Sequence, residues 1–108
     1  MPRRDVVVRA RHRRDARIIS EAATVAHVSR DVILAIDQGT TGSTCLLVDA
    51  TMRVVARATH DFPQHFPEPG RVEHDPNEIW SSVSAAIADA LARSGIAASR
   101  IAAIGVTN

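Results

Sequence analysis

Several residue types that often define a protein's class are scarce or absent in this 108-residue chain. Lysine and tyrosine do not occur, and all 13 basic residues are arginine, which we interpret as a coding bias of the source rather than as chemistry. Cys45 is the single cysteine, which excludes an intramolecular disulfide and favours a reducing compartment, the cytoplasm. No apolar run approaches the roughly 20 residues of a membrane-spanning helix, so we expect no membrane span.

Two well-known nucleotide-binding patterns are also missing. The chain contains neither a Walker sequence nor Gly-x-Gly-x-x-Gly, which excludes a P-loop and a dinucleotide-binding loop of that type. His74 has no second ligand at metal-binding spacing, so it does not indicate a zinc site. Hydrophobic residues nevertheless make up 45% of the chain, which is enough to build the core of one small domain.

Charge divides the chain into two regions. Residues 1–30 carry eight arginines and three acidic residues, whereas residues 31–108 carry five arginines and nine acidic residues. We expect residues 1–30 to form a basic, disordered extension, with an organelle-targeting peptide or a nucleic-acid-binding arm as alternatives. Because no aromatic residue is interleaved with these arginines for base stacking, nucleic acid is the least favoured partner. Residues 31–108 are therefore the candidate domain.

The candidate domain is predicted to contain four strands and one helix in the order β-β-β-α-β. Short apolar or alternating segments predict strands at residues 32–36, 44–49, 53–62 and 100–107. The first two are joined by a short, turn-rich segment and should form an antiparallel hairpin. The last strand follows the helix and should return parallel to the first. Residues 63–75, which are rich in proline, are expected to be extended and exposed.

The predicted helix has clear signals at both ends. Asp75 can cap the N-terminus, Pro76 suits the first helical position, and Glu78 completes a capping-box pattern. Gly95 is placed to end the helix in a left-handed turn. Between these ends, apolar residues recur at helical spacing and predict one core-facing stripe: Ile79, Trp80, Val83, Ala86, Ile87, Ala90 and Leu91.

The segment between the first two strands, DQGTTGS, is rich in residues that suit phosphate binding. Glycines let the backbone approach a ligand closely, and consecutive N–H groups in such a turn can converge on an anion. Threonine and serine hydroxyls add further donors. A Gly- and Thr-rich turn with a purely structural role stays open as an alternative. The candidate phosphate ligands are Gly39, Thr40, Thr41, Gly42 and Ser43.

Asp37 ends the first buried strand, directly before this turn. A carboxylate there can hold a hydrated Mg²⁺ or orient a water molecule. Residue types alone thus predict a phosphate-binding hairpin with a metal-facing carboxylate. Cys45, in the second predicted strand, has no cationic neighbour in the sequence and is expected to be buried and unreactive.

Three segments together carry a resemblance to a known family. They are AIDQGTTGST at residues 35–44, PGRVEHDPNEIW at residues 69–80 and IAAIGVTN at residues 101–108. In this order and spacing they resemble the N-terminal part of the glycerol kinases, which are members of the FGGY family of carbohydrate kinases. The resemblance extends over residues 31–108, which are therefore identified as a partial FGGY N-terminal kinase domain.

The resemblance implies an actin-like (ribonuclease-H-like) ATPase domain of the α/β class, with residues 31–108 as its first half. It implies ATP-dependent phosphorylation of glycerol to sn-glycerol 3-phosphate in glycerol metabolism, with ATP and Mg²⁺ as cofactors and a homo-oligomeric full-length enzyme. Asp37 would face the Mg²⁺, and Thr40 and Thr41 would bond phosphate oxygens. The glycerol-binding residues and the catalytic base are expected beyond Asn108, so the 108-residue chain alone is expected to be inactive.

The sequence departs from the glycerol kinase pattern in two regions. Ser-Ser-Arg is usual after the paired threonines, whereas Gly42, Ser43 and Thr44 stand here, which removes a cationic phosphate contact but leaves the Gly42 N–H. Arg71 stands where tryptophan is usual, and we assign it no role. Two alternatives stay open: a kinase of the same family acting on another polyol or sugar, and a non-catalytic phosphate-binding remnant with an RNA-binding arginine arm.

Overall fold

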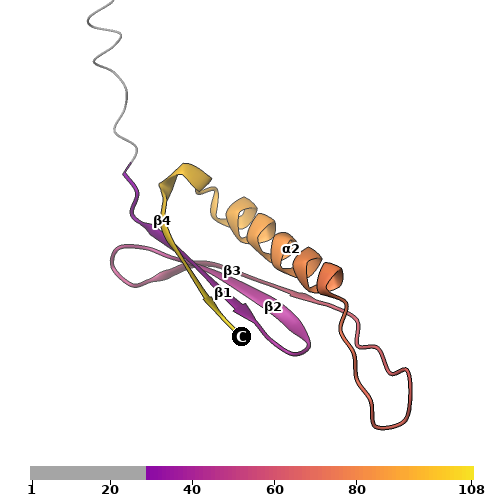
Figure 1. Cartoon of the computed structure of the whole chain (residues 1–108). Helices are drawn as coiled ribbons and strands as arrows, with labels where there is room; N and C mark the ends of the chain where they lie inside the picture. The colour runs from indigo at the N-terminus through magenta and orange to yellow at the C-terminus, as the bar shows by residue number, and fades with distance from the viewer. Residues whose placement is uncertain (1–28) are drawn as a thin grey trace, which may run out of the picture.

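The computed structural model describes residues 29–108, so the predicted basic extension, residues 1–30, lies almost entirely outside the described part. In the described part four strands form one sheet: β1 (Val32–Gln38), β2 (Gly42–Val48), β3 (Val54–Asp61) and β4 (Ile101–Thr107). A long helix, α2 (Pro76–Ser94), and a short 3-10 turn, η1 (Ala98–Arg100), precede β4 (Figure 1). The element order β-β-β-α-β predicted from the sequence is confirmed.

The strands lie in the order β3-β2-β1-β4. β1 and β2 are antiparallel, as are β2 and β3, whereas β4 runs parallel to β1. Gln38 pairs with Ser43 across the hairpin, so β2 begins at Gly42 and not at the predicted residue 44. Because α2 carries the chain back along the sheet, β4 can join β1 in the parallel direction.

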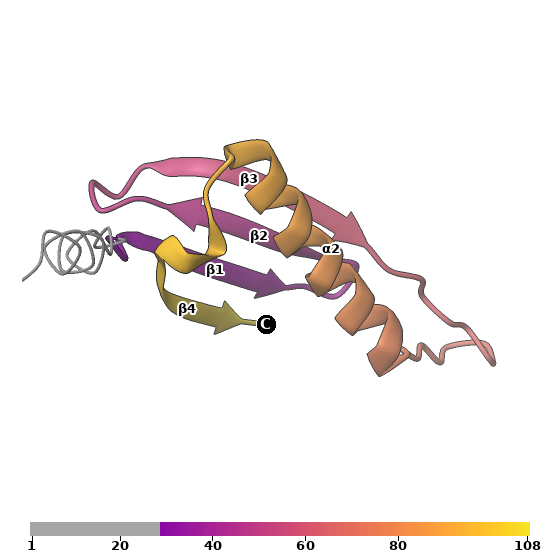
Figure 2. The ribbon, with the colours of Figure 1, turned by 90° about the horizontal axis from the view of Figure 1, so that it is seen from above.

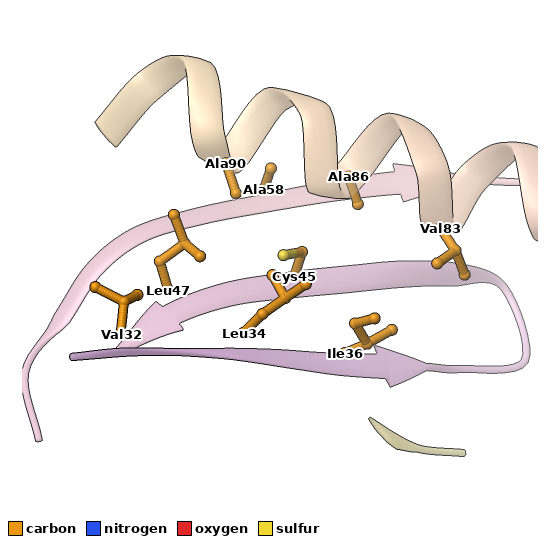
Figure 3. Close-up of a cluster of buried hydrophobic side chains, with 9 residues drawn as sticks. All are labelled: Val32, Leu34, Ile36, Cys45, Leu47, Ala58, Val83, Ala86 and Ala90. Atoms are coloured by element: carbon orange, nitrogen blue, oxygen red, sulfur yellow. The ribbon is translucent and has the colours of Figure 1, made fainter. Parts of the chain in front are cut away.

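Helix α2 covers one face of the sheet (Figure 2). Side chains alternate along a strand, so every second residue of β1 and β2 faces the helix and its neighbours face the other side. Ala86 and Ala90 face the sheet from the helix, and their small side chains allow a close approach. The resulting core consists of Val32, Leu34, Ile36, Cys45, Leu47, Ala58, Val83, Ala86 and Ala90 (Figure 3).

The two ends of α2 follow the predicted signals, with one exception. The Asp75 carboxylate accepts a hydrogen bond from the Asn77 N–H at 2.8 Å, and Pro76 occupies the first turn. Gly95 ends the helix in the left-handed conformation, with φ of 67°. The predicted capping box is wrong, because the Glu78 carboxylate turns away from the cap and contacts His65 Nε2 at 2.6 Å.

Trp80 does not belong to the core stripe predicted from helical spacing. Its side chain is 68% exposed, whereas Val83, one turn later, is buried. Helix α2 packs mainly on β2 and β3. Trp80 lies on the flank of the helix that faces the ends of β1 and β4, where it borders a hollow with Ile36 and Val106. Helical periodicity identifies the apolar stripe but does not show how far the sheet extends beneath it.

An ion pair joins the starts of the two parallel strands. The Arg100 guanidinium donates three hydrogen bonds of 2.8–3.0 Å to the Asp31 carboxylate. The Asp31 N–H donates to the Arg100 carbonyl at 3.1 Å, which adds a backbone link. The hydrogen bonds from Arg100 hold the pKa of Asp31 below its ordinary value. The pair thus ties the start of β4 to the start of β1.

The predictions about Cys45 and about membrane-spanning segments can be compared with the described residues. Cys45 is fully buried in β2, as predicted, and burial raises the pKa of its thiol. This environment disfavours a reactive thiolate. Within residues 29–108, no helix combines the length and apolar character needed to cross a membrane.

Leu47→Ala should strongly destabilise the fold. Leu47 is fully buried between β2 and α2, so its truncation removes apolar contacts and leaves a cavity, at a cost of about 2–5 kcal/mol. Trp80→Ala serves as the control, with an expected loss below about 0.5 kcal/mol because the ring is largely exposed. Urea-induced unfolding followed by circular dichroism measures both. Equal losses for the two variants would contradict the described core.

Candidate functional site

The turn between β1 and β2 has its carbonyl groups anchored and its N–H groups free. The Thr41 carbonyl accepts a hydrogen bond from the Phe62 N–H at 3.1 Å, and the Thr40 carbonyl accepts one from Gln64 Nε2 at 2.9 Å. Neither the Thr40 N–H nor the Thr41 N–H donates to a backbone or side-chain acceptor within residues 29–108. Both residues are exposed. The turn therefore offers two neighbouring backbone donors to a ligand.

The two glycines of the turn are required by close packing and not by unusual backbone angles. Neither Gly39 nor Gly42 has a positive φ, in contrast to Gly70 and Gly95. A Cβ on Gly42 would lie 2.6 Å from Asp61 Oδ1 and 2.9 Å from the His60 carbonyl oxygen of β3. The Gly39 N–H donates to the Gly42 carbonyl at 2.8 Å, which closes the hairpin. Gly42 thus serves the contact between β2 and β3.

Ser43 does not share the exposed surface of the turn. Its side chain is fully buried under α2, where its hydroxyl lies 2.7 Å from Ser82 Oγ. Because the Ser82 hydroxyl donates to the Ile79 carbonyl, the Ser43 hydroxyl is the donor of this pair. The predicted phosphate contact from the Ser43 side chain therefore has no geometric support: the period of two along β2 turns this hydroxyl towards the helix. Its partner Ser82 was not identified from the sequence, since it lies inside an apolar helix stripe.

Asp37 lies on the sheet face opposite α2, at the end of β1. Its pairing partners Thr44 on β2 and Thr107 on β4 share that face, and the Thr44 hydroxyl bonds the Thr59 hydroxyl of β3 at 2.9 Å. Asp37, Thr44 and Thr107 line a hollow of about 500 Å³ together with Arg57. Asp37 is exposed, and the salt bridges within residues 29–108 do not include it. Its carboxylate is therefore available to a cation.

Residues 62–75 brace the turn from one side. Residues 63–75 were predicted to be extended, but they fold back: the His65 N–H donates to the Glu73 carbonyl at 3.0 Å, and the Glu73 N–H donates to the His65 carbonyl at 2.8 Å. Gly70, with φ of 82°, permits the reversal between them. His65 also contacts the Glu78 carboxylate of α2, and this hydrogen bond raises the pKa of His65. The segment is thereby tied to the first turn of the helix.

Gln64 is the site residue that the sequence reasoning missed. Its amide links the Thr40 carbonyl to His74, whose Nε2 lies 2.6 Å from Gln64 Oε1. His74 in turn packs its ring edge-to-face on Phe62, with centroids 5.3 Å apart. Gln64 and Thr40 are far apart in the sequence, and a glutamine in a proline-rich segment carries no local signal of such a contact.

Comparison with known proteins relates this chain to a family of carbohydrate kinases. The model of the N-terminal domain of the FGGY family of carbohydrate kinases matches residues 32–108. Similar curated proteins include glycerol kinase from Brucella ovis, 57% identical over 76 residues, and glycerol kinase from Symbiobacterium thermophilum, 48% identical over 81 residues. The alignments cover 70% and 75% of this chain but only 15% and 16% of those proteins.

Solved structures of sugar kinases share the arrangement. A xyloylose kinase from Brucella ovis aligns with a TM-score of 0.66 and 31% identity, covering 69% of this chain and 16% of that one. Plasmodium falciparum glycerol kinase with ADP aligns with a TM-score of 0.61 and 27% identity, covering 74% of this chain and 16% of that one.

In residues 29–108 the mixed sheet, the helix that covers it and these neighbours define part of a domain with the actin-like ATPase fold, which confirms the predicted fold class. The chain belongs to the FGGY family of carbohydrate kinases and carries sequence of its N-terminal domain. It spans about 15% of the length of the curated relatives that it matches.

Ser43→Ala should lower stability without changing phosphate binding. The substitution removes one buried hydrogen bond, at a cost of about 1 kcal/mol, while Ser82 keeps its bond to the Ile79 carbonyl. Urea unfolding measures the first quantity, and titration calorimetry with inorganic tripolyphosphate measures the second. A tenfold loss of tripolyphosphate affinity at unchanged stability would contradict the buried position of Ser43.

Stability should also fall with rising pH through the His65–Glu78 pair. The folded-state pKa of His65 is raised above the ordinary 6.5, so the pair contributes fully below pH 6.5 and its contribution is lost as pH rises through the folded value. The melting temperature should therefore drop less between pH 6 and pH 9 in Glu78→Gln than in the wild type. The same drop in both proteins would exclude a role for this pair.

Proposed function

We propose that this chain is the phosphate-binding N-terminal part of a kinase that transfers the terminal phosphoryl group of ATP to glycerol, giving sn-glycerol 3-phosphate. The observation that carries the proposal is the turn at residues 39–41, which presents the free N–H groups of Thr40 and Thr41 and directly follows the strand in which Asp37 exposes its carboxylate. A pair of backbone donors suits phosphate oxygens, and a carboxylate without a cationic partner suits Mg²⁺.

The choice of glycerol is supported by a comparison within one organism. The chain is 57% identical to glycerol kinase from Brucella ovis over 76 residues, but 31% identical to the xyloylose kinase from the same species in the aligned structures. The described residues offer binding groups for the nucleotide and none that we assign to the polyol. The substrate is thus proposed from the relatives and the phosphate site from the geometry.

The residues of the turn would act by positioning and by charge stabilisation, on which phosphoryl transfer mainly depends. The Thr40 and Thr41 N–H groups and their hydroxyls would hold phosphate oxygens, with the Gly42 N–H as a further donor. Asp37 would hold Mg²⁺ through bound water, and the metal would neutralise charge on the phosphates. The Gly39 N–H closes the hairpin on the Gly42 carbonyl, and the missing side chain of Gly42 lets β2 pack closely on β3. Proton removal from the glycerol hydroxyl is assigned to no residue of this chain.

Asp37→Asn should weaken binding of ATP only when Mg²⁺ is present. With Mg²⁺ the variant should bind ATP about tenfold more weakly, because the carboxylate that faces the cation is lost. Without Mg²⁺ the variant should bind ATP as well as the wild type or better, because a negative charge near the phosphates is removed. Titration calorimetry of the full chain, with and without Mg²⁺, measures the difference.

Glu68→Gln is the matched control for this experiment. It removes one exposed negative charge from residues 62–75 without touching the turn, so its affinities should match those of the wild type. A loss of affinity in Asp37→Asn that is independent of Mg²⁺ would contradict the metal-facing role. Absence of ATP binding by the wild type would contradict the phosphate site itself.

Substrate choice requires a complete kinase. Residues 32–108 can replace the matching segment of Brucella ovis glycerol kinase, to which this chain is 57% identical over 76 residues. The chimaera should form ADP in the presence of glycerol, with residues 32–108 supplying the proposed phosphate site and the host supplying the polyol-binding residues. A folded chimaera without glycerol-dependent turnover would contradict the proposed function.

A further inference from the structure

Among the described residues, Gln64 is the side chain that connects the turn between β1 and β2 to His74. Its Nε2 donates to the Thr40 carbonyl at 2.9 Å, and its Oε1 lies 2.6 Å from His74 Nε2. Gln64 itself is half-buried, and the edge-to-face contact with the buried Phe62 ring supports His74. The amide is therefore held at both of its ends.

The chemistry of the partners fixes the orientation of the Gln64 amide. A carbonyl oxygen can only accept a hydrogen bond, so the end that faces Thr40 must be the NH₂ group. The oxygen then faces His74, and Nε2 of His74 must carry the proton of that bond. The assignment follows from the acceptor-only character of the Thr40 carbonyl and does not depend on a choice of histidine tautomer.

Anchoring the Thr40 carbonyl also fixes the direction of the Thr41 N–H. In a trans peptide the C=O of one residue and the N–H of the next point in opposite directions, and residues 29–108 contain no cis peptide. The Thr41 N–H therefore points away from Gln64. The Phe62 N–H anchors the Thr41 carbonyl in the same way and directs the Gly42 N–H.

We propose that Gln64, supported by His74, is a positioning residue that holds the peptide between Thr40 and Thr41 with its N–H directed towards the bound phosphate. The inference rests on the proposed phosphate site for its ligand, but the ordering of the turn is a property of the free protein. Without Gln64 the Thr40 carbonyl loses its only protein partner within the described residues, and the peptide plane becomes free to rotate.

The first experiment needs no ligand. Backbone ¹⁵N relaxation of the full chain should give the Thr41 N–H an order parameter near the rigid value of about 0.85 in the wild type. Gln64→Met keeps the length of the side chain but removes the donor, and the order parameter of Thr41 should fall to about 0.6. Residues of β1 and α2 should keep their values, which a general loss of stability would not allow.

The second experiment measures affinity for inorganic tripolyphosphate. Gln64→Met should bind it about five- to tenfold more weakly than the wild type. Gln64→Glu should be weaker still, because its carboxylate would face the Thr40 carbonyl, which it cannot anchor, and would add a negative charge near the anion. Asn77→Asp is the matched control: it makes the same amide-to-carboxylate change in the first turn of α2, away from the Thr40 carbonyl, and should change the affinity less than twofold.

The two experiments separate the inference from the proposed function. An unchanged Thr41 order parameter in Gln64→Met would overturn the positioning role, whatever the protein binds. A fall in the order parameter, combined with no tripolyphosphate binding by the wild type, would uphold the positioning role and overturn the phosphate site. If Gln64→Met does not fold, His74→Ala offers a milder test. It removes an exposed side chain that supports Gln64, so the order parameter of Thr41 should fall by a smaller amount.

Discussion

The packing of α2 on one face of the sheet determines which way the candidate site residues of β1 and β2 face. Ala86 and Ala90 let the helix lie close to the sheet, and this contact buries Ile36 on β1. Since the side-chain period of a strand is two, burial of Ile36 places Asp37 on the opposite face. The same period on β2 buries Ser43 beneath the helix. A register shift of one residue would exchange the buried and exposed residues at this end of the sheet.

The ability of the turn after Asp37 to bind an anion depends on its hydrogen-bonded carbonyl groups as much as on its free N–H groups. A short hairpin loop has several backbone groups without ladder partners, and water usually satisfies them. Here Phe62 and Gln64 satisfy the carbonyls of Thr41 and Thr40 from one side. The donors are left on the other side, so a phosphate group can replace water without competition from protein acceptors. Residues 62–75 thus belong to the proposed phosphate site, although we assign no phosphate ligand to them.

Local signals in the sequence account for much of the fold. Strand alternation, the Asp75 cap and the left-handed Gly95 depend on neighbouring residues, and each appears as expected. Expectations failed where contacts join distant residues: Trp80 lies outside the part of the sheet that α2 covers, Ser43 faces the helix, and Glu78 contacts His65 instead of the cap. The site could be predicted as a turn with an adjacent carboxylate, and the resemblance of three motifs identified the family. The contacts of residues 62–75 with the turn could not be predicted, because they join residues far apart in the sequence, in part through the Gln64 side chain.

In the proposed function, the N–H groups of Thr40 and Thr41 form the anion-binding surface of this FGGY N-terminal domain. A ¹H–¹⁵N correlation spectrum of the full chain, recorded during titration with inorganic tripolyphosphate, tests it residue by residue. The largest downfield shifts of the amide protons should occur at Thr40 and Thr41, because new hydrogen bonds form there. Saturable shifts centred on another part of residues 29–108, or no shifts up to millimolar tripolyphosphate, would contradict the claim.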